Sequence, residues 1–406
     1  MHRPAEDLIE REDQLGTLGE LLSAAVAGSG QTAVLSGASG NGKSVLLDRM
    51  RSLAGEVGTD VTTAIAACTE QSLPLGVIGQ LAGAAGLLTS HAPEPAGAAT
   101  SVAGLLDAAM SRDWDLAQDA SFPPSSAKIL HGLCMAFLRG IERRPMMLCI
   151  DDVHHADPFS MQFLSYLSRR VRATRLLMVL TDLPQLSPAH PAQYVELLHS
   201  STPIVLTVPP LTRAGVADMV RRLPPPVDPG LAGHVHALTG GNPRLTAALV
   251  EDVLRRVEGP PAVGRPVAGE AFIEAVRTCL LRSQPHALPI ARALAVTGGT
   301  AEVPVLAQLL SISEEMVDWG LLALHRVGLL PGHAFRDPRV QAAVLAGMPV
   351  RERAELHRRL AVLGPGGGEP ADIVARHLVD AQDVEGAPGS RRPLGPPPAR
   401  DQSMPG

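Results

Sequence analysis

The sequence contains few aromatic residues and few lysines. Only 2% of its 406 residues are aromatic, so leucine, valine and alanine must fill most of the core. Lysine occurs at positions 43 and 128 alone, and arginine supplies the rest of the positive charge. The formal net charge is −6, which leaves no general excess of positive charge for binding nucleic acid or an anionic membrane surface.

Cysteine and long apolar runs are also scarce. The four cysteines (Cys68, Cys134, Cys149 and Cys279) are widely spaced and form no metal-binding pair, a pattern typical of a reducing compartment. No apolar run reaches the roughly 18 residues that a membrane-spanning helix needs. The charged N-terminus lacks the apolar centre of a signal peptide. We therefore expect a soluble, cytoplasmic protein that does not contact a membrane.

One glycine-rich stretch carries the strongest functional signal. It has two glycines separated by four residues and followed by lysine and serine, between an apolar run at 32–36 and the start of a helix. Such a loop brings backbone N–H groups and a helix N-terminus to phosphate oxygens. We predict that Lys43 reaches the β- and γ-phosphates of ATP or ADP and that Ser44 binds Mg²⁺. The predicted binding residues are Gly37, Ala38, Ser39, Gly40, Asn41, Gly42, Lys43 and Ser44. The alternative is a glycine-rich turn without a ligand.

An apolar run at 146–150 ends in two acids, Asp151 and Asp152. In an open parallel sheet, ligands bind at the carboxyl ends of the strands. We predict that Asp151 holds Mg²⁺ through water and that Asp152 is the catalytic residue that orients an attacking water. The alternative is a strand that ends in two solvated acids. His154 and His155 follow, but adjacent side chains point in different directions and no third ligand is near, so no metal site is predicted there.

The first half of the chain alternates between strand and helix patterns. This alternation predicts an α/β fold with a doubly wound parallel sheet, the P-loop NTPase class, over residues 1–209. Residues 70–125 are rich in alanine, glycine and proline and are expected to form a surface insertion. The predicted strands lie at 32–36, 61–67, 146–150, 176–180 and 204–208.

Beyond residue 209 the pattern is helical. Residues 210–258 predict an all-helical lid, interrupted by the sharp turn Gly240-Gly241-Asn242-Pro243. Residues 270–346 predict helices and a small hairpin around Pro331-Gly332, which is typical of a winged-helix-like domain. Residues 347–385 would begin a helical repeat region. Residues 386–406 are rich in proline, glycine and serine, so we expect a disordered tail.

Together these motifs resemble the ATPase region of the large ATP-binding LuxR-type transcriptional regulators, which are STAND ATPases of the AAA+ superfamily. The resemblance covers roughly residues 6–385. It implies that Glu10, Arg11 and Pro243 lie around the adenine, and that nucleotide binding is coupled to a helical lid, a winged helix and sensing repeats. The segments that carry it are Leu8-Ile9-Glu10-Arg11-Glu12, the glycine-rich loop, Ile150-Asp151-Asp152-Val153-His154-His155-Ala156-Asp157, Gly240-Gly241-Asn242-Pro243 and Arg353-Ala354-Glu355-Leu356-His357.

The sequence differs from that family in two places that affect function. Many members carry an arginine just after the strand at 176–180, whereas this chain has Thr181-Asp182-Leu183-Pro184. An acid near the phosphates would repel them, so slow or absent hydrolysis is expected. Family members continue to a C-terminal DNA-binding helix-turn-helix, whereas this sequence ends at Gly406. We expect either a natural short form or a piece of a longer protein.

The sequence thus favours a regulatory switch that binds ATP or ADP with Mg²⁺ and is at most a slow ATPase, with self-association or a protein partner. An active ATPase or kinase is the first alternative, and it would need a base beyond Asp152 and a substrate pocket. A winged-helix DNA-binding protein is the second. The charges at 335–339 are mixed and no basic face is visible, so we do not expect DNA binding by this chain.

Overall fold

The computed structural model describes residues 8–85, 124–183, 191–199, 202–222, 230–257 and 268–367. Its first part contains a five-stranded sheet with the strand order β2-β3-β4-β1-β5, and each neighbouring pair is parallel. The parallel, doubly wound sheet predicted from the sequence is therefore confirmed. The strands are β1 (Gln31–Ser36), β2 (Asp60–Ile65), β3 (Met146–Asp151), β4 (Leu176–Asp182) and β5 (Ile204–Thr207).

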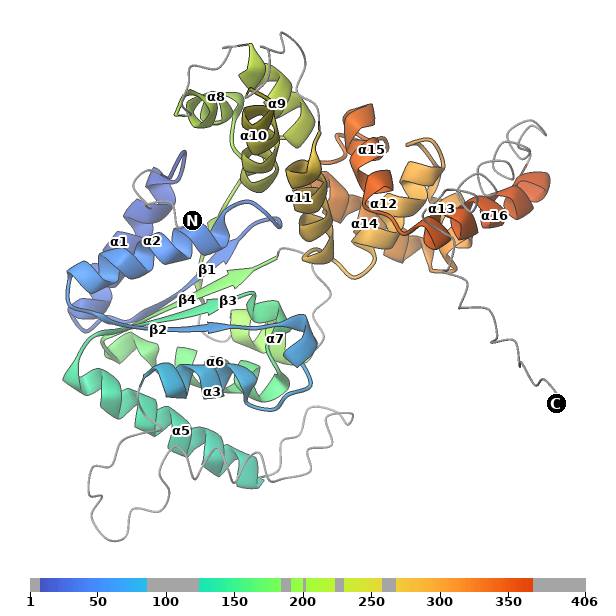
Figure 1. Ribbon diagram of the computed structural model, residues 1–406. Coiled ribbons are helices and arrows are strands. Elements are labelled where there is room, and N and C mark those ends of the chain that lie inside the picture. Colours follow the sequence, from blue (N-terminus) through green and yellow to red (C-terminus); the bar gives the residue numbers. More distant parts are fainter. Residues whose placement is uncertain are drawn as a thin grey trace, which may run out of the picture.

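Helices cover both faces of this sheet (Figure 1). On one face α1 (Glu12–Val26) and α2 (Lys43–Glu56) pack through leucine, alanine and methionine side chains. The other face carries α3 (Gly76–Ala84), α5 (Pro124–Arg143), α6 (Pro158–Ser168) and α7 (Pro191–His199). Every residue of β3 and β4 is buried, as expected for central strands covered on both faces. Short 3₁₀ turns lie at η1 (Cys68–Glu70), η2 (Val153–His155) and η3 (Val171–Ala173).

The start of α6 illustrates a local signal. Asp157 is its N-cap and accepts a hydrogen bond from the Ser160 N–H at 3.0 Å, while Pro158 occupies the first helical position. The helix therefore begins at Pro158. The same carboxylate accepts from the Leu75 N–H at 3.0 Å, which fixes α3 beside α6.

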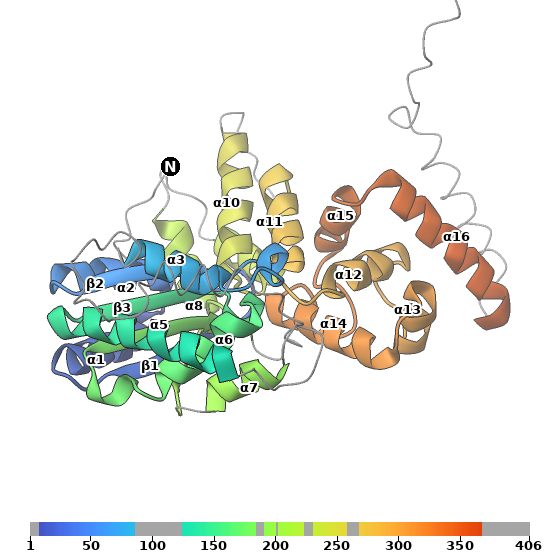
Figure 2. The same ribbon diagram turned by 90° about the horizontal axis from the view of Figure 1, so that it is seen from below.

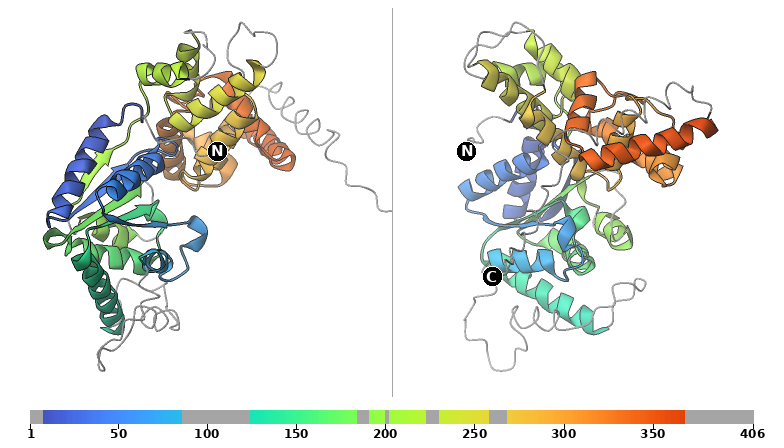
Figure 3. Two further views of the ribbon diagram at one scale, coloured as in Figure 1. Left: turned by 60° about the vertical axis from the view of Figure 1, so that its left-hand side comes forward. Right: turned by 45° about the vertical axis from the view of Figure 1, so that its right-hand side comes forward.

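The second part of the molecule is helical. Figure 2 shows α10 and α11 side by side, between the sheet and the later helices. Figure 3 shows α16 on the side of this helical part that faces away from the sheet. Buried apolar residues from Leu211 to Leu360 form one continuous cluster, so α8 to α16 share a single core. The helices are α8 (Arg213–Arg221), α9 (Leu231–Thr239), α10 (Pro243–Val257), α11 (Glu270–Leu281), α12 (Ala287–Val296), α13 (Val303–Leu310), α14 (Glu314–Val327), α15 (Pro338–Ala346) and α16 (Val350–Gly367).

Two helix ends meet within this part. Gly240 caps the C-terminus of α9 and Gly328 caps that of α14, both with positive φ. A Cβ on Gly240 would lie 2.8 Å from the carbonyl oxygen of Gly328, and one on Gly328 would lie 2.7 Å from that of Thr239. The two backbones approach this closely only because neither position carries a side chain.

The hairpin predicted around Pro331-Gly332 is not formed as a pair of strands. Among residues 268–367 the pairing is limited to an isolated antiparallel bridge between Thr300 and Ala334. The Arg336 N–H also donates to the Leu329 carbonyl at 3.0 Å. Two apolar residues on each side of the turn are too few for a ladder, and Leu329 is buried in the helical core instead.

Three of the predicted segments extend beyond the described residues. The tail at 386–406, residues 368–385 of the repeat region and most of the insertion at 70–125 lie outside the described residues. Across the described ranges, no helix combines the length and the apolar character needed to cross a membrane.

Candidate nucleotide-binding site

The glycine-rich loop connects β1 to α2 at the carboxyl edge of the sheet. Gly40 and Gly42 have φ angles of +85° and +90°, which favour glycine. Gly37 lies so close to the segment after β5 that a Cβ there would be 2.5 Å from the carbonyl oxygen of Val208. The loop ends at Gly42, the N-cap of α2. A loop of this kind, leading into a helix N-terminus, fits an anion such as a phosphate.

Lys43 lies in the first turn of α2 and is buried. Its ammonium donates hydrogen bonds to the carbonyl oxygens of Gly37 at 2.7 Å and Ala38 at 3.1 Å, so it spans the loop. Burial lowers the pKa of Lys43, and the nearby charges of Asp152 and Asp151 act against that shift. A cation is thus held at the mouth of the loop.

The next residue joins the loop to the neighbouring acid strand. The Ser44 hydroxyl donates to Oδ2 of Asp151 at 2.7 Å. The Thr181 hydroxyl donates to Oδ1 of Asp151 and accepts the Asp152 N–H, which is 2.7 Å away. Burial, and then the charge of Asp151, raise the pKa of Asp152. The structure therefore brings Lys43, Ser44, Asp151 and Asp152 to one place.

A cleft of about 880 Å³ runs along the loop. This volume lies within the range of small-molecule pockets. Its polar wall includes loop residues 39–45 and Asp152. Its apolar wall comes from the N-terminal segment and from α8 and α10 and their flanks, and consists of Leu8, Ile9, Leu211, Met219, Pro243 and Ala247. Three arginines, Arg222, Arg244 and Arg282, also line it. The sequence alone gives no signal for these arginines, because each follows or begins an ordinary helix pattern.

Arg11 lines this cleft and is buried. Its guanidinium donates to the carbonyl oxygens of Pro209 at 2.6 Å, Glu10 at 2.7 Å and Asn41 at 3.1 Å. Burial lowers its pKa. Arg11 therefore fixes the N-terminal segment against both the loop and the end of the sheet domain.

Glu10 has a different place from the one that the family resemblance implies. It is absent from the cleft wall. Its carboxylate accepts the Thr212 N–H at 2.7 Å and the Thr212 hydroxyl, so it lies at the N-terminus of α8. Burial would raise the pKa of Glu10, but these hydrogen bonds from Thr212 hold it below its usual range. Glu10 positions α8 and does not itself face the cleft.

Asn242 joins three parts of the molecule and is fully buried. Its side-chain oxygen accepts the N–H groups of Arg244 at 3.1 Å and Leu245 at 3.3 Å, which caps α10. Its side-chain nitrogen donates to the carbonyl oxygens of Ser39 at 2.8 Å and Val327 at 3.1 Å. One side chain thus connects the loop, α10 and the end of α14. An asparagine before a proline at a helix start is the signal of its capping role.

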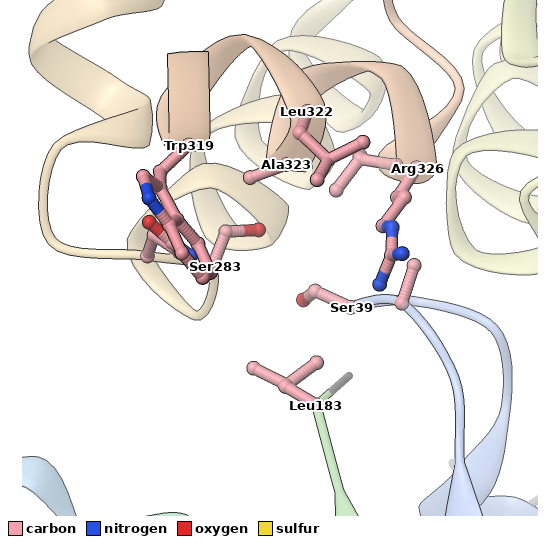
Figure 4. Close-up of a pocket in the computed structure, with 10 residues that line it drawn as sticks. Ser39, Leu183, Ser283, Trp319, Leu322, Ala323 and Arg326 are labelled. Atoms are coloured by element: carbon pink, nitrogen blue, oxygen red, sulfur yellow. The ribbon is translucent and has the colours of Figure 1, made fainter. Parts of the chain in front are cut away.

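A second, much smaller cavity of about 30 Å³ separates the loop from α14. Figure 4 shows Trp319, Leu322, Ala323 and Arg326 of α14 on one side, and Ser39 and Leu183 on the other. This space suits about one water molecule and not a nucleotide. The larger cleft is therefore the candidate site, and α14 packs close to the outer side of the loop.

Asp182, the acid expected to repel phosphate, is buried at the end of β4 and does not line the cleft. Its Oδ1 lies 3.8 Å from Nδ1 of His154, and its side chain is hydrogen-bonded with Tyr194. Burial raises the pKa of Asp182 to about 6 and lowers that of His154 to about 2. The Gly37 N–H of the loop donates to the Asp182 carbonyl at 3.3 Å, and the charge of Asp182 also acts on Lys43.

We expect Asp182→Asn to stabilise the fold more at pH 8 than at pH 5. The pKa of Asp182 rises from 3.8 to about 6 on folding, so its protonated form favours the native state and that contribution is lost as the pH rises through 6. The gain from the variant should be about 1.5 kcal/mol larger at pH 8 than at pH 5. Urea unfolding at the two pH values measures it. Equal gains at both would contradict the shift.

Comparison with known proteins identifies the class of the sheet domain. Residues 7–180 match the family model described as AAA ATPase domain. This part of the chain therefore has an AAA-type P-loop ATPase fold. An uncharacterized protein of Rhizobium meliloti (strain 1021) is 25% identical over 388 residues, which cover 87% of this chain and 36% of that protein. The chain thus spans about a third of the length of that relative.

Several solved structures show a distant likeness to this chain. A Walker-type ATPase of Pyrococcus abyssi has 16% identity and a TM-score of 0.47, covering 84% of this chain and 97% of that one. Cdc6p of Pyrobaculum aerophilum has 14% identity and a TM-score of 0.45, covering 93% and 94%. A STAND protein with a tetratricopeptide repeat sensor from Pyrococcus horikoshii has 14% identity and a TM-score of 0.37, covering 93% and 48%.

Proposed function

We propose that this protein is a regulatory switch that binds ATP or ADP. The observation that carries the proposal is the hydrogen bond between Ser44 and Asp151 beside the cleft, which joins the loop that holds Lys43 to the acid strand. A cation, a hydroxyl and a carboxylate at the end of a glycine loop are the groups that a magnesium-bound phosphate chain requires.

The donors fit that ligand. Backbone N–H groups of the loop 37–44 and the Lys43 ammonium would hold the phosphates, and Ser44 and Asp151 would hold Mg²⁺. Within the described residues no group of three histidine, cysteine or acidic side chains forms a metal site by itself. The metal would therefore share its ligands with phosphate oxygens, as Mg²⁺ commonly does. Bound Mg²⁺ supplies positive charge to those oxygens.

The apolar wall of the cleft fits a nucleobase. Ile9, Met219 and Pro243 lie there with Arg11, and they belong to three different segments. A base between these segments would hold them together, with Glu10 acting indirectly through α8. This arrangement supports binding by Arg11 and Pro243 and a supporting position for Glu10.

We propose a switch because the loop is connected to the helical part. Asn242 bonds to both the loop and α14. We assign residues 1–209 to the ATPase core, 210–258 to a helical lid, 270–346 to a winged-helix-like domain and 347–385 to the start of a repeat region. A nucleotide that favours one packing of these parts by about 5.5 kcal/mol moves the equilibrium from 1:99 to 99:1. The family resemblance suggests that the output is transcription regulation, exerted through self-association or a protein partner.

Hydrolysis is proposed to be slow or absent. Asp152 is the candidate that would orient water, and burial together with the charge of Asp151 raises its pKa. The end of β4 carries Thr181 and Asp182 and no cation.

Two measurements test this function. Calorimetry should show Mg-dependent binding of both ADP and ATP, and small-angle scattering should show different shapes of the two complexes. Identical scattering profiles would argue against a switch. Steady phosphate release above about 1 per second, within the usual enzyme range, would favour the alternative of an active ATPase or kinase.

A further inference from the structure

A cation from the last group of helices reaches the nucleotide cleft. Arg282 is the residue directly after α11 and lines the cleft together with Lys43, Ser44 and Asp152. It is the one cleft residue, among those that the structure describes, that comes from α11 or any later helix. The other residues of the cleft come from the N-terminal segment, the loop, the strand ends, α8 and α10 and their flanks.

The charge of Arg282 acts on the polar wall of the cleft. Burial is the main cause of the lowered pKa values of Lys43 and His155, and Arg282 adds to both. Burial and Asp151 raise the pKa of Asp152, and Arg282 acts against them. By contrast, no such effect of Arg282 is found on Glu10 or Arg11, which lie beside the apolar wall. The next residue, Ser283, lines the small cavity with Ala38 and Ser39, so the end of α11 lies beside the loop.

The Arg282 side chain is available to a ligand. It is exposed, and within the described residues it makes no hydrogen bond or ion pair with another side chain. On the same helix, Arg277 is instead paired with Glu274 at 3.6 Å. A guanidinium offers five donors in a fixed plane, which suits phosphate oxygens.

The helix that carries Arg282 is held against the loop. Cys279, one turn before Arg282, is fully buried. A Cβ on Gly40 would lie 2.9 Å from its sulfur, and it shares a hydrogen bond with the Ser39 side chain. The backbone N–H of Arg282 bonds to the Thr278 carbonyl at 3.0 Å, which completes the last turn. The position of Arg282 is therefore set by packing against the loop.

The charges around the loop favour an additional cation at the phosphates. Lys43 is a single positive charge near three carboxylates, those of Asp151, Asp152 and Asp182. A magnesium-bound triphosphate carries one more negative charge than the diphosphate complex does. The cleft arginines supply the balance, and of these Arg282 is the one that follows α11.

We propose that Arg282 binds the terminal phosphate of a bound nucleoside triphosphate, so that the domain beginning at α11 distinguishes ATP from ADP. This inference rests on the proposed nucleotide binding. Asp152 follows β3, one residue beyond the proposed magnesium ligand, and it lines the cleft together with Arg282. Without the terminal phosphate this contact would be lost, and the end of α11 would no longer be bound to the nucleotide.

The test compares two ligands in three variants. Binding of ADP and of a non-hydrolysable ATP analogue, both with Mg²⁺, is measured by calorimetry on the full chain. We expect Arg282→Ala to weaken binding of the analogue at least about tenfold, the scale of one charge-assisted hydrogen bond, and binding of ADP less than about threefold. Arg282→Lys should retain part of the preference, because it keeps the charge but loses the planar donors. Arg277→Ala, on the surface of the same helix, should change neither affinity.

The outcomes separate the inference from the function. Equal losses for both ligands, or no loss for the analogue, would overturn the assignment of Arg282 while leaving nucleotide binding intact. If the unmodified chain binds neither ligand, the proposed function fails first. Urea unfolding of Arg282→Ala without ligand should match that of the unmodified chain, because the side chain makes no bonds within the described protein.

Discussion

Lys43→Ala is expected to abolish the stabilisation that Mg-ATP and Mg-ADP confer. At a free ligand concentration of 100 times Kd, the unmodified chain should gain about 2.7 kcal/mol in free energy of unfolding, and the variant should gain none. The reason is that Lys43 is the cation held inside the loop, 2.7 Å from the Gly37 carbonyl, where it would meet the phosphates. Thermal unfolding with and without ligand measures the effect.

The chain provides a matched control, because its other lysine is remote from the loop. Lys128 is exposed on α5, and Lys128→Ala should leave the ligand effect unchanged. Without ligand, the free energy of unfolding of Lys43→Ala should be at most about 1–3 kcal/mol lower than that of the unmodified chain, which is the cost of two lost hydrogen bonds. An equal ligand-induced gain in Lys43→Ala and the unmodified chain would remove the loop from consideration as the binding site.

Asn242→Ala should be the most destabilising single change at the site. It removes the cap of α10 and leaves two buried carbonyl oxygens, those of Ser39 and Val327, without their donor. Losing a cap costs about 1 kcal/mol, and each unsatisfied buried group costs about 1–3 kcal/mol. We expect a total loss of about 3–5 kcal/mol in urea unfolding. The midpoint should fall in the presence and in the absence of nucleotide.

A second cap in the chain separates the two contributions. Ser313 caps α14 by accepting the Met316 N–H at 3.3 Å and makes no bond to the loop. Ser313→Ala should therefore cost only the capping share, about 1 kcal/mol. Asn242→Asp keeps the oxygen that caps α10 but turns the donor into an acceptor facing two carbonyls, so it should be nearly as harmful as alanine. Comparable small losses in all three variants would show that Asn242 is an ordinary cap.

The sequence was sufficient for the sheet and the loop because their signals are local. Apolar runs such as 146–150 are typical of buried central strands, and the spacing from Gly37 to Ser44 is that of a phosphate-binding loop. The end of β3 at Asp151 and its closeness to Ser44 follow from parallel topology, because strand ends share one edge.

The contacts between domains required the fold. Asn242 is recognisable as a cap, but its bond to Val327, 85 residues away, depends on how α14 packs. Arg282 follows an ordinary amphipathic helix, and only the position of α11 directs it into the cleft. Asp182 was expected near the phosphates, and burial beside His154 and Tyr194 keeps its carboxylate off the cleft wall, although its charge acts on Lys43. The sequence does not reveal which side of a strand end faces a ligand.

The meeting of α9 and α14 through Gly240 and Gly328 has a consequence for how this protein can vary. At this contact there is room only for the Cα hydrogens of the two glycines, since even one methyl group would overlap a carbonyl oxygen. An alanine at either position would push α14 away from α9. That shift would move the Val327 carbonyl and weaken the hydrogen bond that it accepts from Asn242. Mutational drift in this protein is therefore expected to spare these two glycines even where neighbouring surface residues change freely.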